Sequence, residues 1–167
     1  LELGILYAKL GTKVTVIEMT PSLLPGTDVD MVKLLTRSLK KRKLTIHTSA
    51  KAQSVQVTGK TASLNVETKK GEEVLEVDKV LVAVGRRPNT EGLGLEKAGV
   101  KTNEKGFIDV DNQLRTNVKH IFAIGDVTAP PLLAHKDSKE GLVVADVIKG
   151  LNEHLDVRAM PAAVFTD

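Results

Sequence analysis

The spacing of apolar residues changes several times along this chain, and these changes restrict the folds that it can adopt. Residues 1–11 show a helical spacing, residues 13–18 form a short β-branched run, and residues 27–43 return to a helical spacing. From residue 44 to residue 84 the period becomes two, which is typical of strands. Helices that alternate with strands, with a β-meander inserted among them, predict an α/β architecture with crossover connections.

Two helices are predicted before the stretch of period two. The first ends near Gly11, a residue suited to a C-terminal cap, and the second begins after Thr27 or Asp28 as its N-cap. The apolar residues that we expect on the inner face of the first helix are Leu3, Leu6, Tyr7 and Leu10. Those that we expect on the inner face of the second helix are Val29, Val32, Leu35 and Leu39.

The stretch of period two predicts several strands joined by turns. The expected strands are residues 44–47, 52–58, 61–68, 72–77 and 79–85. The last of them is almost continuously apolar, as expected for a strand that is buried on both faces. It ends at Gly85, where the character of the sequence changes, so we place the main domain boundary there.

A second series of elements is predicted after Gly85. Residues 86–100 read as a loop with a short helix, and residues 106–111 as an isolated strand. Residues 120–126 read as a buried strand, and residues 134–151 as a helix. Strand and helix therefore alternate again in the second half of the chain.

The composition excludes several classes of protein. Apolar residues make up 41% of the 167 residues, which is enough for the core of one domain or of two small ones. The net charge of +3 is small and only 2% of residues are aromatic, so a nucleic-acid partner is not expected. No apolar run is long enough to cross a membrane. The chain has no cysteine and its histidines lack metal-site spacing, so we expect neither a metal site nor a cysteine nucleophile.

The ends of the chain look like breaks within longer elements. It begins at Leu1 within a helical phrase, without a starting methionine, and it stops at Asp167 without a cap or tail. We therefore expect an internal fragment that is truncated at both ends.

Glu18 is the first candidate for a ligand-binding residue. A helix, a strand and then an acid at the carboxyl end of the strand form the second half of a dinucleotide-binding βαβ unit. In such a unit the acid accepts hydrogen bonds from the adenosine ribose of NAD and repels the 2′-phosphate of NADP. An equally good interpretation from this feature alone is that Glu18 ends a strand in solvent.

Asp126 is the second candidate. It ends the expected strand 120–126 and precedes two prolines, so its carboxylate could accept hydrogen bonds from a polyol or a ribose. Asp in such a place also commonly forms a turn or an N-cap. Gly85 similarly ends a strand, where it could let a cofactor approach the backbone. Arg86 and Arg87 could bind anionic groups or remain solvated in a loop.

Six motifs in order carry a family resemblance: "LELG" at residues 1–4, "VTVIE" at 14–18, "VLVAVGRRPNT" at 80–90, "IFAIGDV" at 121–127, "LLAHK" at 132–136, and "MPAAVFTD" at 160–167. Together they make the sequence resemble the pyridine nucleotide-disulfide oxidoreductases, and within that family the dihydrolipoamide dehydrogenase branch. The resemblance covers nearly the whole chain. It implies a Rossmann-like FAD/NAD(P)-binding fold with an inserted antiparallel β-meander.

The resemblance implies a cofactor-binding role for ten residues. Glu2, Glu18, Ala50 and Gly85 correspond to positions that contact NAD, with Glu18 at the ribose and the backbone of Gly85 on the nicotinamide side. Gly125 and Asp126 correspond to the pair that holds the ribityl chain of FAD. The segment whose backbone lies at the flavin edge corresponds to Leu132, Leu133, Ala134 and His135. The one departure is Asp137, where the family usually has a small residue; it could lower the flavin potential if it points inward, or cap the helix toward solvent.

The family's reaction passes electrons from a dithiol such as dihydrolipoamide, through a disulfide and FAD, to NAD. Its cysteine pair and acid-base dyad match nothing in this chain, so we expect no catalytic residue here and an inactive fragment on its own. The resemblance implies residues 1–85 as an NAD-binding domain, 86–158 as part of the FAD-binding region, and 159–167 as the start of a dimer-forming interface domain.

The resemblance also implies partners and a compartment. The intact protein is expected to be a homodimer that serves the dihydrolipoyl groups of 2-oxo acid dehydrogenase or glycine cleavage complexes. It is expected in the bacterial cytoplasm, or in the mitochondrial matrix of a eukaryote. Alternatives are another member of the family, such as mercuric reductase, NADH oxidase or transhydrogenase, or a non-catalytic truncated product that binds nucleotide weakly.

Overall fold

The computed structural model describes residues 1–166 and divides the chain into two units. The first unit is Leu1–Ala83 together with the residues from Val164 onward, and the second is Val84–Ala163. Asp167, the last residue of the predicted interface segment 159–167, lies outside the described residues. The domain roles assigned to residues 1–85, 86–158 and 159–167 remain predictions, because this division does not say what each unit binds.

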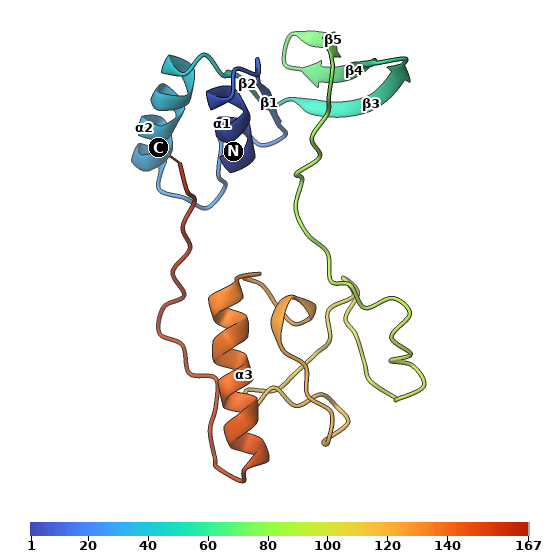
Figure 1. Cartoon of the computed structure of the whole chain (residues 1–167). Helices are drawn as coiled ribbons and strands as arrows, with labels where there is room; N and C mark the ends of the chain where they lie inside the picture. Colours follow the sequence, from blue (N-terminus) through green and yellow to red (C-terminus); the bar gives the residue numbers. More distant parts are fainter. Residues whose placement is uncertain (167) are drawn as a thin grey trace. The chain divides into compact units, whose positions relative to one another are not determined.

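The first unit contains a parallel strand pair with two helices packed against it (Figure 1). In chain order its elements are α1 (Glu2–Lys9), β1 (Thr15–Glu18), α2 (Val29–Lys41) and β2 (Thr45–Thr48). The two strands align from Thr15 opposite Thr45 to Glu18 opposite Thr48. Parallel strands need a crossover connection, which α2 supplies. The predicted strand–helix–strand alternation is therefore confirmed.

Helix α2 begins and packs largely as its sequence predicts. The Asp28 carboxylate caps the helix by accepting hydrogen bonds from Asp30 N at 2.9 Å and Met31 N at 3.4 Å. Val32 and Leu39 are buried in the core of the unit. Val29, which was expected on the same face, is 59% exposed, because it lies in the first turn beyond the edge of that core.

We expect Asp28→Ala to lower the free energy of unfolding by about 1 kcal/mol, because two amide N–H groups of the first turn lose their acceptor. The measurement is denaturant unfolding of the intact protein. Asp28→Ser is the matched control, since its hydroxyl can still cap the helix, and it should cost only a few tenths of a kcal/mol. Equal losses for both variants would contradict the capping role.

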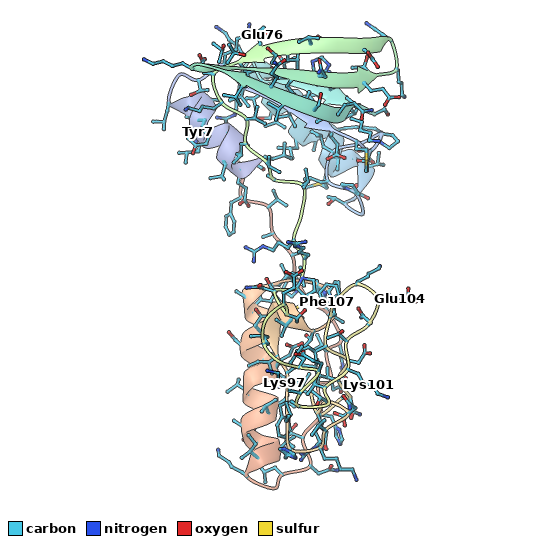
Figure 2. All side chains as sticks on the ribbon, turned by 90° about the vertical axis from the view of Figure 1, so that its right-hand side faces the viewer. Tyr7, Glu76, Lys97, Lys101, Glu104 and Phe107 are labelled. Carbon is cyan, nitrogen blue, oxygen red and sulfur yellow. The ribbon has the colours of Figure 1, made fainter. Side chains whose placement is uncertain are left out.

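The inner face of α1 differs from the prediction. Leu3, Leu6, Tyr7 and Leu10 are 49%, 49%, 45% and 74% exposed (Tyr7 is labelled in Figure 2), whereas Ile5 is 3% exposed. Leu1 and Ala8 pack against the same core as Ile5. Leu1, Ile5 and Ala8 also have a helical spacing, so the sequence contains two apolar stripes, and the structure buries the second one.

The inserted meander is confirmed as a three-stranded antiparallel sheet, with the strands in chain order. Its strands are β3 (Lys51–Thr58), β4 (Thr61–Thr68) and β5 (Gly71–Val77). Ala62 and Val66 of the central strand are buried, while Val57 on β3 is 71% exposed. Val57 pairs directly with Ala62 and so lies on the same face, which shows that burial on this face is centred on β4 and does not extend to β3.

Three predicted strands and one predicted helix are absent from the described chain. Residues 79–84 form no strand and are exposed, and residues 106–111 and 120–126 contribute single bridges, Ile108 to Thr102 and Phe122 to Arg115. Residues 86–100 form turns rather than a short helix. An apolar run becomes a strand only if a neighbouring strand satisfies its N–H and C=O groups, and the described residues provide none here.

The second unit is built on a long helix and a short 3-10 turn. Its regular elements are η1 (Gly125–Val127) and α3 (Ala134–Ile148). Val143 and Val147 of α3 pack with Leu114, and a second small core contains Val100, Ile108 and Ala123. Phe107, labelled in Figure 2, is 8% exposed. The helix predicted over residues 134–151 is confirmed, and it ends three residues earlier than expected.

Candidate functional site

The first candidate site lies where β1 and β2 end. Because the strands are parallel, their carboxyl ends meet at one edge, and Ala50 N donates a hydrogen bond to Glu18 O at 3.0 Å. Ala50 is 1% exposed. The structure therefore brings together two of the predicted cofactor-binding residues.

The Glu18 carboxylate is held in one orientation. Its Oε1 accepts hydrogen bonds from Thr20 N and Thr20 Oγ1, both at 2.7 Å. Sequence reasoning missed Thr20, although a Thr two residues after a strand-ending acid is a usable signal for such a turn. The fixed carboxylate presents its second oxygen as an acceptor, which is the group that a pair of ribose hydroxyls requires.

A shallow depression of about 300 Å³ adjoins this strand edge. Its lining residues are Met19, Ser49, Lys51, Glu67, Thr68 and Lys69. Met19 follows Glu18 directly, and Ser49 and Lys51 flank Ala50. The depression offers an apolar side chain, hydroxyls, two ammonium groups and one carboxylate, a mixed set that fits the adenosine end of a dinucleotide.

Glu2 and Gly85 are the other two residues that we predicted to contact NAD. Glu2 begins α1, and its Oε1 accepts a hydrogen bond from Phe165 N at 2.7 Å. Gly85 belongs to the second unit and has a φ of +128°. A Cβ there would meet nothing within 4 Å, so the backbone angle alone requires glycine. The NAD contacts predicted for Glu2 and Gly85 stay predictions.

The second candidate site is the turn that carries Asp126. Gly125 has a φ of +83°, a conformation that favours glycine, and Asp126 follows it in η1. The Asp126 Oδ2 accepts a hydrogen bond from Arg86 Nη1 at 2.8 Å. Asp126 is 35% exposed at its side chain and Arg86 is 75% exposed, so the carboxylate remains accessible to a ligand. Arg86 is thus both solvated in a loop and paired with a carboxylate of its own unit, and its binding of a ligand anion stays a prediction.

A buried ion pair underlies this turn, and the sequence analysis did not identify it. Lys136 and Glu140 lie one helical turn apart on α3, with Lys136 Nζ at 2.9 Å from Glu140 Oε1. Their side chains are 5% and 4% exposed. Glu140 Oε2 accepts a hydrogen bond from Gly125 N at 2.7 Å. The only sequence signal was the Lys–Glu spacing of four, which usually marks an exposed helix face.

The predicted flavin-edge segment leads into α3. Leu132 and Leu133 are half-buried, Leu133 is the N-cap residue, and Ala134 and His135 are the first helical residues. The first N–H groups of a helix have no partner within it and favour negative charge. His135 Nε2 donates to Pro161 O at 2.7 Å, so its ring is occupied by a structural contact. This geometry fits a flavin held by backbone groups rather than by the imidazole.

Of the two alternatives for Asp137, the structure shows the one in which the carboxyl group points toward the Gly125 turn rather than capping the helix toward solvent. The α3 N-terminus has no side-chain cap, and a Cβ on Gly125 would lie 3.4 Å from Asp137 Cγ. Its Oδ1 lies 3.6 Å from Lys136 Nζ and has no hydrogen-bond partner among the described residues. The ammonium group of Lys136 attracts the carboxylate inward, which accounts for this orientation.

The described residues carry neither a metal-binding cluster nor a membrane-spanning helix. Residues 1–166 contain no group of three His, Cys, Asp or Glu side chains that could hold a metal ion. No helix in the same residues is long and apolar enough to cross a membrane.

Comparison with curated proteins found relatives along the whole chain. The dihydrolipoyl dehydrogenase of Thermus scotoductus is 47% identical over 168 residues, which is 99% of this chain and 36% of that protein. The dihydrolipoyl dehydrogenase of Bacillus subtilis is 42% identical over 167 residues, again 99% of this chain and 36% of the relative. The chain thus spans about a third of the length of these relatives.

Solved structures show the same fold. LpdA from Mycobacterium tuberculosis has a TM-score of 0.88 and 31% identity, covering 99% of this chain and 36% of that one. The HOCl-induced flavoprotein disulfide reductase RclA from Escherichia coli has a TM-score of 0.81 and 28% identity, covering 91% of this chain and 34% of that one. The predicted α/β fold with an antiparallel insertion is confirmed.

The sequence profile described as "Pyridine nucleotide-disulphide oxidoreductase" matches residues 1–144. This match covers most of the chain and includes both candidate sites. Together with the relatives, it establishes that the chain belongs to the pyridine nucleotide-disulphide oxidoreductase family.

Proposed function

We propose that this chain forms part of the cofactor-binding frame of a dihydrolipoyl dehydrogenase, a flavoprotein that passes electrons from dihydrolipoamide through a disulfide and FAD to NAD. The observation that carries the proposal is the 47% identity, over 99% of the chain, to a protein named dihydrolipoyl dehydrogenase. The two candidate sites support it, since each offers a carboxylate at a place where a cofactor sugar needs an acceptor.

Residues of this chain would act by binding and orienting the two cofactors. The Glu18 carboxylate accepts hydrogen bonds from the adenosine ribose of NAD and disfavours a 2′-phosphate by charge repulsion. The Asp126 carboxylate accepts hydrogen bonds from the ribityl hydroxyls of FAD. The first N–H groups of α3 stabilise negative charge at the flavin edge. FAD, when bound, supplies the two-electron transfer between dithiol and nicotinamide.

The dithiol–disulfide exchange belongs to residues outside this sequence, since the chain contains no cysteine. We therefore propose that these 167 residues alone are inactive. The intact protein would act as a homodimer on the dihydrolipoyl groups of a 2-oxo acid dehydrogenase or glycine cleavage complex. We place it in the cytoplasm of a bacterium, or in the mitochondrial matrix of a eukaryote.

The test is anaerobic mixing of the purified intact protein with dihydrolipoamide, followed by NAD⁺. We expect dihydrolipoamide to change the spectrum of bound flavin, and NAD⁺ to be converted to NADH only in its presence. Parallel assays with mercuric ion, oxygen or a second pyridine nucleotide as electron acceptor distinguish the other family activities. Loss of NADH to oxygen without any oxidation of dihydrolipoamide would contradict the proposal.

A second candidate is a flavoprotein disulfide reductase with a different substrate. It is favoured by the TM-score of 0.81 to RclA, which is described as an HOCl-induced flavoprotein disulfide reductase. In that case NADH would reduce the bound flavin, but dihydrolipoamide would not.

A further inference from the structure

Lys136 and Glu140 form an ion pair that is almost fully buried, which is unusual for charged side chains. Their side chains are 5% and 4% exposed, so both groups have lost most of their hydration. Burying charges is costly, and well-packed apolar residues in place of such a pair often give equal or greater stability. Stability alone therefore does not account for this pair, and its other contacts indicate a further role.

Both backbone groups of Gly125 are held by this cluster. Glu140 Oε2 accepts from Gly125 N at 2.7 Å. Lys136 Nζ lies 3.4 Å from Gly125 O, and Thr128 Oγ1 donates to the same oxygen at 2.8 Å. Lys136 Nζ also donates to Thr128 Oγ1 at 3.3 Å. The peptide groups on both sides of this left-handed glycine are therefore fixed in direction.

The fixed turn leads directly to Asp126. Gly125 precedes Asp126 by one residue, and its φ of +83° sets the direction in which the chain enters η1. Among the described residues the Asp126 side chain is held by Arg86, whose side chain is 75% exposed. Such an exposed ion pair fixes a side chain only weakly. The buried cluster is the more rigid support for the Asp126 backbone.

We propose that Lys136 and Glu140 are positioning residues that hold the Gly125 turn so that Asp126 is preorganised to receive the ribityl chain of FAD. The inference rests on the proposed function of Asp126 as the ribityl acceptor. Glu140 acts through its hydrogen bond from Gly125 N, and Lys136 neutralises Glu140 and helps to hold Gly125 O. The nearby Asp137 carboxylate, with Oδ1 3.6 Å from Lys136 Nζ, is the other charged group facing Lys136.

Two double variants of the intact protein test the inference. Lys136→Met/Glu140→Leu removes both charges and the acceptor for Gly125 N, whereas Lys136→Met/Glu140→Gln removes both charges and keeps an acceptor oxygen. Apoprotein is titrated with FAD, and hydrogen exchange of the Gly125 amide is followed by mass spectrometry or NMR without cofactor. Asp146→Asn/Lys149→Met is the matched control, since it removes an exposed ion pair of the same helix, 3.6 Å apart.

We expect Lys136→Met/Glu140→Leu, the Met/Leu variant, to bind FAD about tenfold more weakly and to show faster hydrogen exchange at the Gly125 amide. Lys136→Met/Glu140→Gln is called the Met/Gln variant. The Met/Gln variant should stay within about threefold of the unchanged protein, with the amide still protected. The exposed control should change neither quantity. If the Met/Leu variant does not fold, Thr128→Val takes its place, with about a threefold loss of FAD affinity expected.

Equal FAD affinities for the Met/Leu and Met/Gln variants would overturn the inference, whether both are weakened or neither is. An unchanged affinity in Thr128→Val would also overturn it. Asp126→Ala separates this failure from that of the proposed function. If Asp126→Ala leaves FAD binding unchanged, the assigned role of Asp126 is wrong. If Asp126→Ala binds FAD more weakly but the Lys136/Glu140 double variants bind it normally, only the positioning role is rejected.

Discussion

Glu18→Arg should raise the KM for NAD⁺ of the intact protein by about a hundredfold and lower the KM for NADP⁺. Two hydrogen bonds from ribose hydroxyls to a carboxylate are lost, and hydrogen bonds to a charged group contribute about 1.5–3 kcal/mol each. The new guanidinium would instead bind a 2′-phosphate. The measurement is steady-state oxidation of dihydrolipoamide with each nucleotide.

The surroundings of Glu18 favour this change of preference. Lys51, Lys69 and Glu67 line the depression beside the strand edge, so the lining has a net charge of one positive unit, which favours a 2′-phosphate modestly. Replacing Glu18 also removes the acceptor of Thr20 N and Oγ1. The folding of each variant is therefore checked by thermal unfolding before its kinetics are interpreted.

Two controls separate the charge of Glu18 from its hydrogen bonds. Glu18→Gln has one acceptor oxygen in place of two, so it can serve Thr20 or a ribose hydroxyl but not both, and its KM for NAD⁺ should rise by about tenfold. Thr20→Val removes the hydroxyl that orients the carboxylate and should raise KM by about threefold. If Glu18→Arg leaves both KM values unchanged, Glu18 is not the ribose acceptor.

The sequence predicted the elements whose signals are local. The β1–α2–β2 unit, its Asp28 cap and the turns of the meander follow from residue period and turn chemistry within a few residues. The paired carboxyl ends of β1 and β2 then follow from the parallel connection, which placed Glu18 beside Ala50. These features need no information from distant parts of the chain.

The sequence failed where the outcome depends on distant neighbours. Residues 79–84 are apolar enough for a buried strand, yet Val84 is 93% exposed, because no strand of the described chain pairs with them. In α1, two apolar stripes are compatible with a helix, and only packing decides that Ile5 is buried and Leu6 is not. A strand and a buried helix face are both defined by partners, which a local period cannot supply.

The buried cluster under Asp126 was missed for the same reason. A Lys and a Glu four residues apart normally indicate a solvated helix face. Lys136 and Glu140 are buried because the turn at Gly125 covers them and offers its N–H and C=O groups as partners. The sequence predicted a binding role for Asp126 from its place between an expected strand and two prolines, whereas the residues that support this turn became evident only from the structure.

Asp126→Ala should weaken FAD binding to the intact protein by about a hundredfold. The variant removes the accessible carboxylate of the Gly125 turn, and hydrogen bonds from ribityl hydroxyls to a charged acceptor contribute about 1.5–3 kcal/mol each. Flavin content after dialysis and the dissociation constant from flavin titration measure the loss. Asp126→Asn keeps one acceptor oxygen and should lose about tenfold.

Arg86→Ala decides whether this loss comes from the cofactor contact or from the ion pair. Asp126→Ala also leaves Arg86 without its partner, but the Arg86 side chain is 75% exposed and regains water readily. An exposed ion pair contributes at most about 1 kcal/mol, so Arg86→Ala should change FAD affinity by less than about threefold. If Arg86→Ala instead matches Asp126→Ala, the ion pair rather than the carboxylate governs FAD binding, and Asp126 is not the ribityl acceptor.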